Sequence, residues 1–200
     1  MKLVLFDLDG TLISGNASVK FGLYMLRRGI CSRTRLVAAI GLYGLFALGL
    51  CSFQRMQRGT FRLLFAGKPK APFVHAAQEF CDGCFSQIAR SDVAQELHAP
   101  NTTQAIFSSS PDFLVRPFAE KFGVSHYFGS KYEVDSYGNF HKVVPLNKTA
   151  VVELLSYDTL VVYSDSIADL ELLKKADVPV AVSPDKALLQ YARKHNWRVM

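Results

Sequence analysis

The sequence predicts an α/β fold in which a parallel β-sheet is flanked by helices and interrupted by a helical insertion. Short apolar runs recur along the chain, helical patterns alternate with them, and residues 15–95 break this alternation. A chain of 200 residues, half of them hydrophobic, is long enough for one domain with a sizeable insertion. This composition excludes a disordered chain, and four cysteines are too few for a disulfide scaffold.

The expected strands are apolar runs of the kind that lie buried in parallel sheets. They cover residues 3–6, 104–107, 159–163 and 178–182, and the first three are each followed directly by Asp or Ser. Residues 127–143 predict a hairpin that turns at residues 135–139, where turn-forming residues gather.

Helical patterns between these strands cover residues 112–122, 148–156, 167–176 and 186–194. The first is expected to begin with Ser110 as its N-cap and Pro111 at its first position. Pro117 lies inside the same pattern and is expected to kink that helix or end it early. Strands that alternate with helices favour parallel pairing through right-handed crossovers.

The insertion is strongly basic. Ten Lys and Arg residues and no Asp or Glu lie between residues 11 and 78, so the remainder of the chain carries a net charge of −4 within a total of +6. This asymmetry predicts two parts, a catalytic core of residues 1–14 and 96–200 and a helical cap of residues 15–95. The cap is expected to attract anions.

Residues 36–54 are 19 consecutive uncharged residues, which as one helix would measure about 28 Å. A simple membrane span is excluded, because a single crossing would place Asp7 on one side of the membrane and Ser108, Lys148 and Asp165 on the other. These residues are expected to form one site, which could not then assemble. Two alternatives remain. The segment is either a buried helix pair, broken near residues 41–44 and covering a site as a lid, or a surface that lies on an anionic membrane.

Polar side chains follow the expected strands where each one ends. Asp7 and Asp9 follow the first strand, Ser108 the second, and Asp165 with Asp169 the third. Ligands of open α/β sheets bind at the carboxyl ends of the strands, so these groups are expected to converge. Gathered carboxylates repel one another unless a hard cation joins them, and Mg²⁺ prefers oxygen ligands.

The run Asp7-Leu8-Asp9-Gly10-Thr11 resembles the DxDGT signature of the haloacid dehalogenase (HAD) superfamily. Ser108, Lys148 and the segment 164–169 match the order of its second, third and fourth motifs. The place of the insertion resembles the cap of the phosphoserine-phosphatase-like subfamily IB. The resemblance implies a Rossmann-like HAD core with a C1-type helical cap, and phosphatase activity that requires Mg²⁺.

The resemblance also implies a role for each site residue. Asp7 would attack phosphorus and form an aspartyl-phosphate, and Asp9 would protonate the leaving alcohol and then activate water. Ser108 and Lys148 would hold the phosphoryl oxygens, although only the family position favours Ser108 over Ser109 and Ser110. Lys142 is a weaker candidate for the lysine. An aspartate at position 9 favours phosphate chemistry over carbon–halogen cleavage.

The remaining roles concern the metal and the phosphate region. Asp165 would ligate Mg²⁺ together with Asp7 and the backbone carbonyl of Asp9, and Asp169 would support this site. Thr11 is expected to contact Asp9 or the phosphate. The Ser-Asp-Ser run after residue 163 is similar to that of phosphatases acting on phosphatidylglycerophosphate, so a lipid phosphate at a membrane surface is the alternative to a soluble ester.

Other assignments fit less well. Phosphoserine is disfavoured by the resemblance, because phosphatases that act on it typically carry a glutamate soon after the first motif, whereas here no acidic residue follows Asp9 until Glu79. A pair of cysteines, Cys81 and Cys84, has the spacing of half a zinc site but lacks a second half. A non-catalytic anion-binding module stays open, whereas nucleic-acid binding is not expected. The chain is expected in the cytoplasm, with a possible peripheral contact with the inner face of a membrane.

Overall fold

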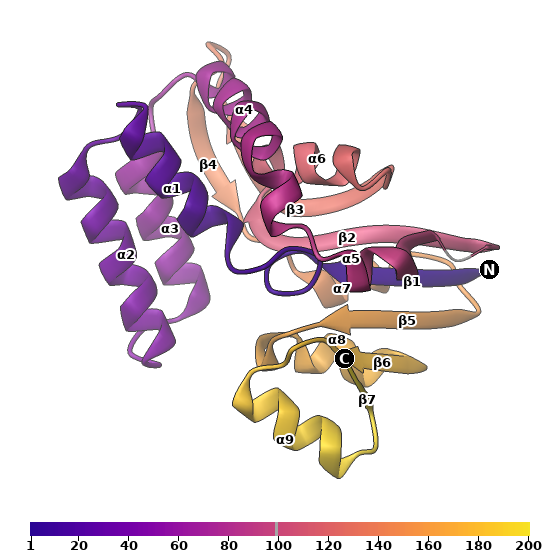
Figure 1. The fold of residues 1–200 in the computed structure, drawn as a ribbon. Coiled ribbons are helices and arrows are strands. Elements are labelled where there is room, and N and C mark those ends of the chain that lie inside the picture. The colour runs from indigo at the N-terminus through magenta and orange to yellow at the C-terminus, as the bar shows by residue number, and fades with distance from the viewer. Residues whose placement is uncertain (99) are drawn as a thin grey trace.

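The computed structural model describes residues 1–98 and 100–200, which form one seven-stranded sheet in the order β4-β3-β2-β1-β5-β6-β7 (Figure 1). The strands are β1 (Lys2–Asp7), β2 (Thr102–Pro111), β3 (His126–Val134), β4 (Phe140–Val144), β5 (Thr159–Ser164), β6 (Val178–Ala181) and β7 (Arg198–Val199). Only the β3–β4 hairpin is antiparallel among these pairs. The predicted α/β class is confirmed.

Strand β1 lies at the centre of the sheet and pairs in register with β2 and β5. Its side chains alternate between the two faces, so Phe6 belongs to one hydrophobic cluster and Leu5 to another. Helices of the insertion and α6 (Asp112–Lys121) cover the Phe6 face. The face of Leu5 is covered by α7 (Lys148–Val152), α8 (Leu170–Lys175) and α9 (Lys186–Lys194).

Helix boundaries differ from prediction at four points outside the insertion. Ser110 is not the N-cap of α6, because it belongs to β2, and Pro111 occupies the cap position without a side-chain bond. Helix α6 continues four residues past Pro117, so the early end expected there is wrong. Helix α7 stops at Val152, and residues 167–169 form a 3₁₀ turn before α8.

The insertion is helical, as predicted. Its helices are α1 (Ala17–Arg27), α2 (Arg33–Ala47), α3 (Phe53–Leu64), α4 (Lys70–Ile88) and α5 (Ser91–Ala94), followed by a 3₁₀ turn at Gln95–His98. The first three begin at Asn16, Ser32 and Ser52, whose side chains each accept a bond from a backbone N–H of the first turn. Helices α1–α3 lie together beyond one end of the sheet (Figure 1).

The apolar stretch 36–54 does not form one helix. It turns at residues 48–52, where Gly49 has a φ of +72°, and α2 and α3 pack side by side. The break expected near Gly41 and Gly44 is therefore misplaced, since both lie inside α2. Within residues 1–98 and 100–200, no helix is long and apolar enough to cross a membrane.

Burial of this stretch is also incomplete. Helix α2 buries only Leu36 and Ala39, whereas Leu48 and Leu50 in the turn are 74% and 68% exposed. The expectation of a buried helix pair is thus wrong for α2 and its turn. Helix α3 differs, because one of its faces is buried against the rest of the molecule.

An aromatic cluster joins the insertion to the edge of the sheet. Phe140 of β4 lies at its centre and is 2% exposed. The rings around it come from α3, the turn after it, α4, α6 and β3: Phe61, Phe65, Phe73, Phe113 and Tyr132, with centroids 5.4 to 6.4 Å from that of Phe140. Edge-on rings at these separations add to the free energy gained by burial.

We expect Phe140→Ala to lower the free energy of unfolding by about 3–5 kcal/mol, since it leaves a cavity among these rings. Urea denaturation followed by circular dichroism measures the change. Tyr137→Ala is the control, because Tyr137 lies in the adjoining hairpin turn and is 87% exposed. Equal losses in the two variants would contradict this account of the cluster.

Candidate active site

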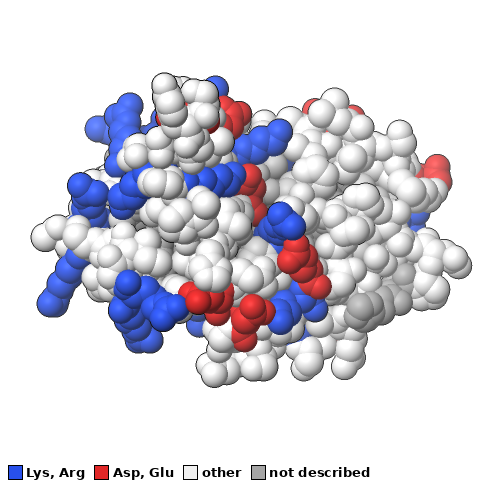
Figure 2. Space-filling model, turned by 90° about the horizontal axis from the view of Figure 1, so that it is seen from above, with Lys and Arg blue, Asp and Glu red and all other residues white. Residues whose placement is uncertain are grey.

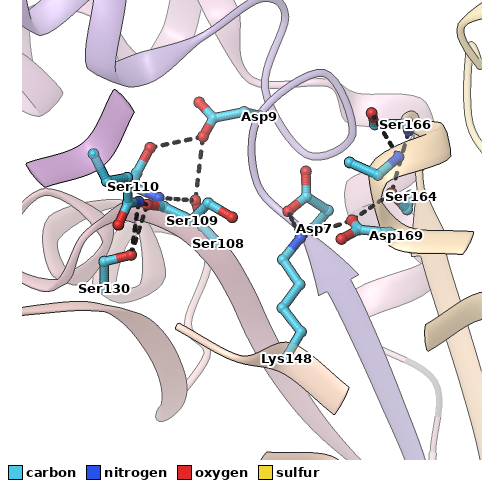
Figure 3. A network of polar contacts seen from close by, with 12 residues as sticks. Asp7, Asp9, Ser108, Ser109, Ser110, Ser130, Lys148, Ser164, Ser166 and Asp169 are labelled. Carbon is cyan, nitrogen blue, oxygen red and sulfur yellow. Dashed lines mark hydrogen bonds and ion pairs between the residues drawn. The ribbon is translucent and has the colours of Figure 1, made fainter. Parts of the chain in front are cut away.

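A buried lysine joins two aspartates at the carboxyl end of β1. The Nζ atom of Lys148 lies 2.6 Å from Oδ1 of Asp7 and 2.7 Å from Oδ2 of Asp169 (Figure 3). The side chains of all three residues are only 10–11% exposed. Asp169 also accepts a hydrogen bond of 2.7 Å from Oγ of Ser164, at the end of β5.

Burial changes the titration of this group. Desolvation is the largest effect on Asp7 and raises the pKa of its carboxyl well above the usual range, although Lys148 opposes that rise. Burial alone would lower the pKa of Lys148, but the negative charges of Asp7 and Asp169 raise it above its ordinary value. Lys148 is therefore held as a cation beside the carboxylate of Asp7.

Asp9 points toward the end of β2 instead of toward Lys148 (Figure 3). Its Oδ2 accepts hydrogen bonds from Ser110 Oγ at 2.8 Å and Ser108 Oγ at 3.2 Å, and its Oδ1 accepts one from the backbone N–H of Ala17. Desolvation raises the pKa of Asp9, and these three bonds oppose the rise. A carboxyl group with a raised pKa suits proton transfer near neutral pH.

Asp165 lies directly against the loop after β1. A Cβ atom on Gly10, whose φ is +76°, would lie 2.0 Å from Oδ2 of Asp165, so only glycine allows this approach. Desolvation, with smaller contributions from the negative charges of Asp169 and Asp9, raises the pKa of Asp165 to about 6. No Lys or Arg of the described residues forms an ion pair with it.

This donor set fits a hard divalent cation. Asp165 is a desolvated carboxylate that forms no ion pair with the Lys and Arg residues that the structure describes, and Asp7 lines the same cavity as a second carboxylate. Within the described residues, no three His, Cys, Asp or Glu side chains converge closely enough to hold a metal by themselves. Mg²⁺ is commonly held by one or two carboxylates, completed by water and substrate phosphate, and the residues match that pattern.

One sequence prediction differs from the geometry, and another agrees with it. The hydroxyl of Thr11 is buried and has no hydrogen-bond partner among the described residues, so the contact expected with Asp9 is absent. Lys142 is exposed on β4, opposite Glu133, whereas Lys148 enters the site. The lysine predicted from the motif order is thus the one beside Asp7.

Sequence reasoning misassigned Ser110 and missed Asp185, and both residues shape the site. Ser110 bonds Asp9 and also lies 2.8 Å from Ser18 Oγ of α1. Asp185 accepts bonds from the backbone N–H of Ile167 and of Leu188, and so fixes the segment after Asp165. Its position just before the predicted helix 186–194 is an N-cap signal that could have revealed it.

A cavity of about 850 Å³ connects these groups to the insertion. One end is polar and contains Asp7, Asp9, Lys148 and Asp165. The opposite wall is formed largely by apolar side chains of α1–α3, among them Met25, Leu36, Ile40, Phe53, Met56 and Leu64. The insertion therefore covers the polar site with an apolar wall.

The two cysteines with zinc-like spacing do not line this cavity. Cys81 and Cys84 are free thiols on α4, and burial raises the pKa of the Cys81 thiol to about 12. Glu79 is likewise occupied elsewhere, since it accepts bonds from Tyr24 Oη and Arg28 and does not line the cavity.

Known proteins resemble this chain in sequence and in fold over nearly its whole length. The chain is 24% identical to a histidinol-phosphatase of Neisseria meningitidis serogroup C, over 99% of this chain and 97% of that protein. A Bordetella pertussis protein of unknown function has a similar fold, with a TM-score of 0.87, 21% identity and coverage of 100% and 97%. A phosphoserine phosphatase, solved as an analogue of its phospho-aspartyl intermediate, has a TM-score of 0.63, 20% identity and coverage of 99% and 91%.

A family profile gives the assignment. The profile of haloacid dehalogenase-like hydrolases matches residues 4–174, which include Lys148 and the four aspartates Asp7, Asp9, Asp165 and Asp169. The resemblance first indicated by the motifs is confirmed over most of the chain. This chain belongs to the haloacid dehalogenase-like hydrolase family.

Proposed function

We propose that this chain is an Mg²⁺-dependent phosphatase that hydrolyses a phosphomonoester through an aspartyl-phosphate on Asp7. The observation that carries the proposal is the ion-paired arrangement of Asp7, Lys148 and Asp169 at one end of the cavity. The names of relatives that act on histidinol phosphate and phosphoserine support a phosphomonoester as the class of substrate. The identity of the alcohol is a separate question.

In the first step, a carboxylate oxygen of Asp7 attacks phosphorus as the bond to the leaving oxygen breaks. Two anions must meet, and the ammonium group of Lys148 reduces their repulsion. Protonated Asp9 donates its proton to the leaving alcohol, and Ser108 and Ser110 hold its carboxyl group in place. Mg²⁺ held by Asp7, Asp165 and the backbone carbonyl of Asp9 would supply further positive charge against the phosphoryl oxygens.

In the second step, water attacks the phosphorus of the aspartyl-phosphate. Asp9, now deprotonated, accepts a proton from that water, and the bond between phosphorus and Asp7 breaks. The products are orthophosphate and the restored carboxylate of Asp7. Asp9 is ready for the next cycle because it has regained the proton that it gave to the alcohol.

Phosphate release from a panel of esters tests this proposal. The panel contains soluble phosphomonoesters and detergent-dispersed lipid phosphates, each measured with and without Mg²⁺. Release that depends on Mg²⁺ supports the proposal. If no ester releases phosphate under any condition, the chain is a non-catalytic anion-binding module instead.

We expect Asp7→Asn to reduce turnover by at least about 10³-fold, because the amide is not a competent nucleophile. Its carbonyl oxygen can still accept the bond from Lys148, so the fold is expected to survive. Phosphate release and thermal unfolding are the measurements. Asp82→Asn, the same change at an exposed position of α4, is the control, and equal activity in both variants would eliminate Asp7 as the nucleophile.

Asp9→Asn is expected to slow hydrolysis of alkyl phosphates by roughly 10²–10⁴-fold, the range typical for loss of a general acid. Aryl phosphates should lose less, because their leaving groups need less protonation. Slower dephosphorylation should also prolong the aspartyl-phosphate, which acid quenching and mass spectrometry detect. A uniform loss across leaving groups would rule out proton donation by Asp9.

A second candidate is a lipid phosphate bound at a membrane surface. The apolar wall of the cavity favours a hydrophobic leaving alcohol, because α1–α3 contain no acidic residue that could meet an ammonium group. Apolar side chains also face outward, with Leu48 and Leu50 at the tip between α2 and α3. Arg55, Arg58 and Arg62 line a small hollow on α3 beside this tip.

The charge distribution agrees with an anionic surface as the partner. Figure 2 shows Lys and Arg side chains gathered over the side of the molecule that α1–α3 form, with uncharged surface between them. Such a mixture of exposed apolar and cationic side chains is typical of segments that lie on anionic bilayers. This candidate would place the cavity next to the lipid headgroups.

The double variant Leu48→Glu/Leu50→Glu is expected to lose at least tenfold in binding to vesicles of anionic phospholipid, since two charges would enter the apolar region. Co-sedimentation measures the bound fraction, which should also fall with added salt. Leu154→Glu is the control, because Leu154 is 85% exposed on another side of the chain. Equal recovery with neutral vesicles, or none with either, would leave the soluble ester as the substrate.

A further inference from the structure

The side chain of Gln57 on α3 reaches from the insertion to the end of β2. It is 7% exposed, and its Nε2 donates hydrogen bonds of 2.7 Å to the carbonyl oxygen of Ser109 and 3.0 Å to Ser130 Oγ. Because a carbonyl oxygen can only accept, the amide nitrogen must face Ser109. The amide oxygen is buried without a partner among the described residues.

A buried amide oxygen without a hydrogen bond is costly, so an apolar residue of similar size would be the expected occupant of this position. The two bonds of Nε2 are what the glutamine provides in return. These bonds form where the regular hydrogen-bonded ladder between β2 and β3 is interrupted, because the register of the two strands shifts between Phe107 and Pro111. Such bulges re-aim side chains beside active sites.

Ser130 completes the arrangement from β3 (Figure 3). Its hydroxyl donates to the Ser109 carbonyl oxygen at 2.9 Å and accepts from Gln57 and from the backbone N–H of Leu146 at 3.2 Å. One donor and two acceptor positions are thus all used. Leu146 lies two residues before Lys148, so the same hydroxyl contacts the loop that delivers the lysine.

We propose that Gln57 is a positioning residue for phosphoryl transfer. Through the two hydrogen bonds of Gln57, α3 holds the Ser109 carbonyl and the Ser130 hydroxyl. The first contact positions Ser108 and Ser110, and the second positions the loop before Lys148. This inference rests on the proposed phosphatase function and deepens it, because the grip on the phosphoryl group becomes complete only with α3 in place. Gln57 itself does not touch the reacting atoms.

The test compares Gln57→Leu with Gln87→Leu, the same substitution at an exposed position of α4 that does not line the cavity. Gln57→Leu should lower kcat by about 10- to 100-fold and weaken inhibition by orthovanadate by a similar factor, since small displacements of catalytic groups have effects of this size. Gln87→Leu should change neither quantity more than twofold. Thermal unfolding checks that both variants fold.

A double-mutant cycle with Ser130→Ala adds a readout of the network. If Gln57 acts through Ser109 and Ser130, the double variant should lose little more than Ser130→Ala alone. Fully additive losses, or a Gln57→Leu defect confined to KM with kcat and orthovanadate affinity unchanged, would overturn the proposal. If Gln57→Leu does not fold, the orthovanadate affinity of Ser130→Ala becomes the deciding measurement, and an unchanged affinity would contradict the positioning role of Gln57.

Calorimetric binding of orthophosphate with Mg²⁺ separates this proposal from the one on which it rests. If the unaltered chain hydrolyses no ester, the proposed function fails, while weaker phosphate binding by Gln57→Leu than by Gln87→Leu still supports positioning. If the unaltered chain turns over and both variants match it in turnover and phosphate affinity, only the positioning role fails.

Discussion

The ion pairs of Lys148 with Asp7 and Asp169 constrain the rest of the site. Three charges with about a tenth of their surface exposed are tolerated only together, because removal of one partner leaves an uncompensated buried charge. Asp7 ends β1, Asp169 follows β5, and Lys148 begins α7. The end of the central strand, its neighbour and the loop before α7 must therefore meet within hydrogen-bonding distance.

The sheet order explains why this meeting place can also hold a phosphoryl group. Parallel pairing of β1 with both β2 and β5 brings the carboxyl ends of three strands to one edge. β2 contributes Ser108 and Ser110, which draw Asp9 away from Lys148. Two aspartates two residues apart thus have different surroundings, one beside a cation and one among hydroxyl groups, and such a difference separates a nucleophile from an acid.

The sequence was informative where the signal is local and less so where tertiary contacts decide. Apolar runs predicted β1, β2, β5 and β6, and the motif order selected Lys148 over Lys142. Ser110 was misassigned as a helix cap, because its bond to Asp9 spans 101 residues and leaves no local pattern. The turn at Gly49 was misplaced for the opposite reason, since three glycines in one apolar stretch offer similar local breaks.

The insertion contributes to the site by what it lacks as well as by what it contains. Without an acidic side chain on α1–α3, the wall opposite Lys148 cannot neutralise a cationic substrate group, and its apolar side chains would desolvate one. A phosphomonoester with an apolar alcohol brings no cation to the apolar wall, because its charge is on the phosphate group beside Lys148. In the proposed function, substrate choice depends on the cavity wall and phosphate chemistry on the sheet, and Gln57 lies where the two meet.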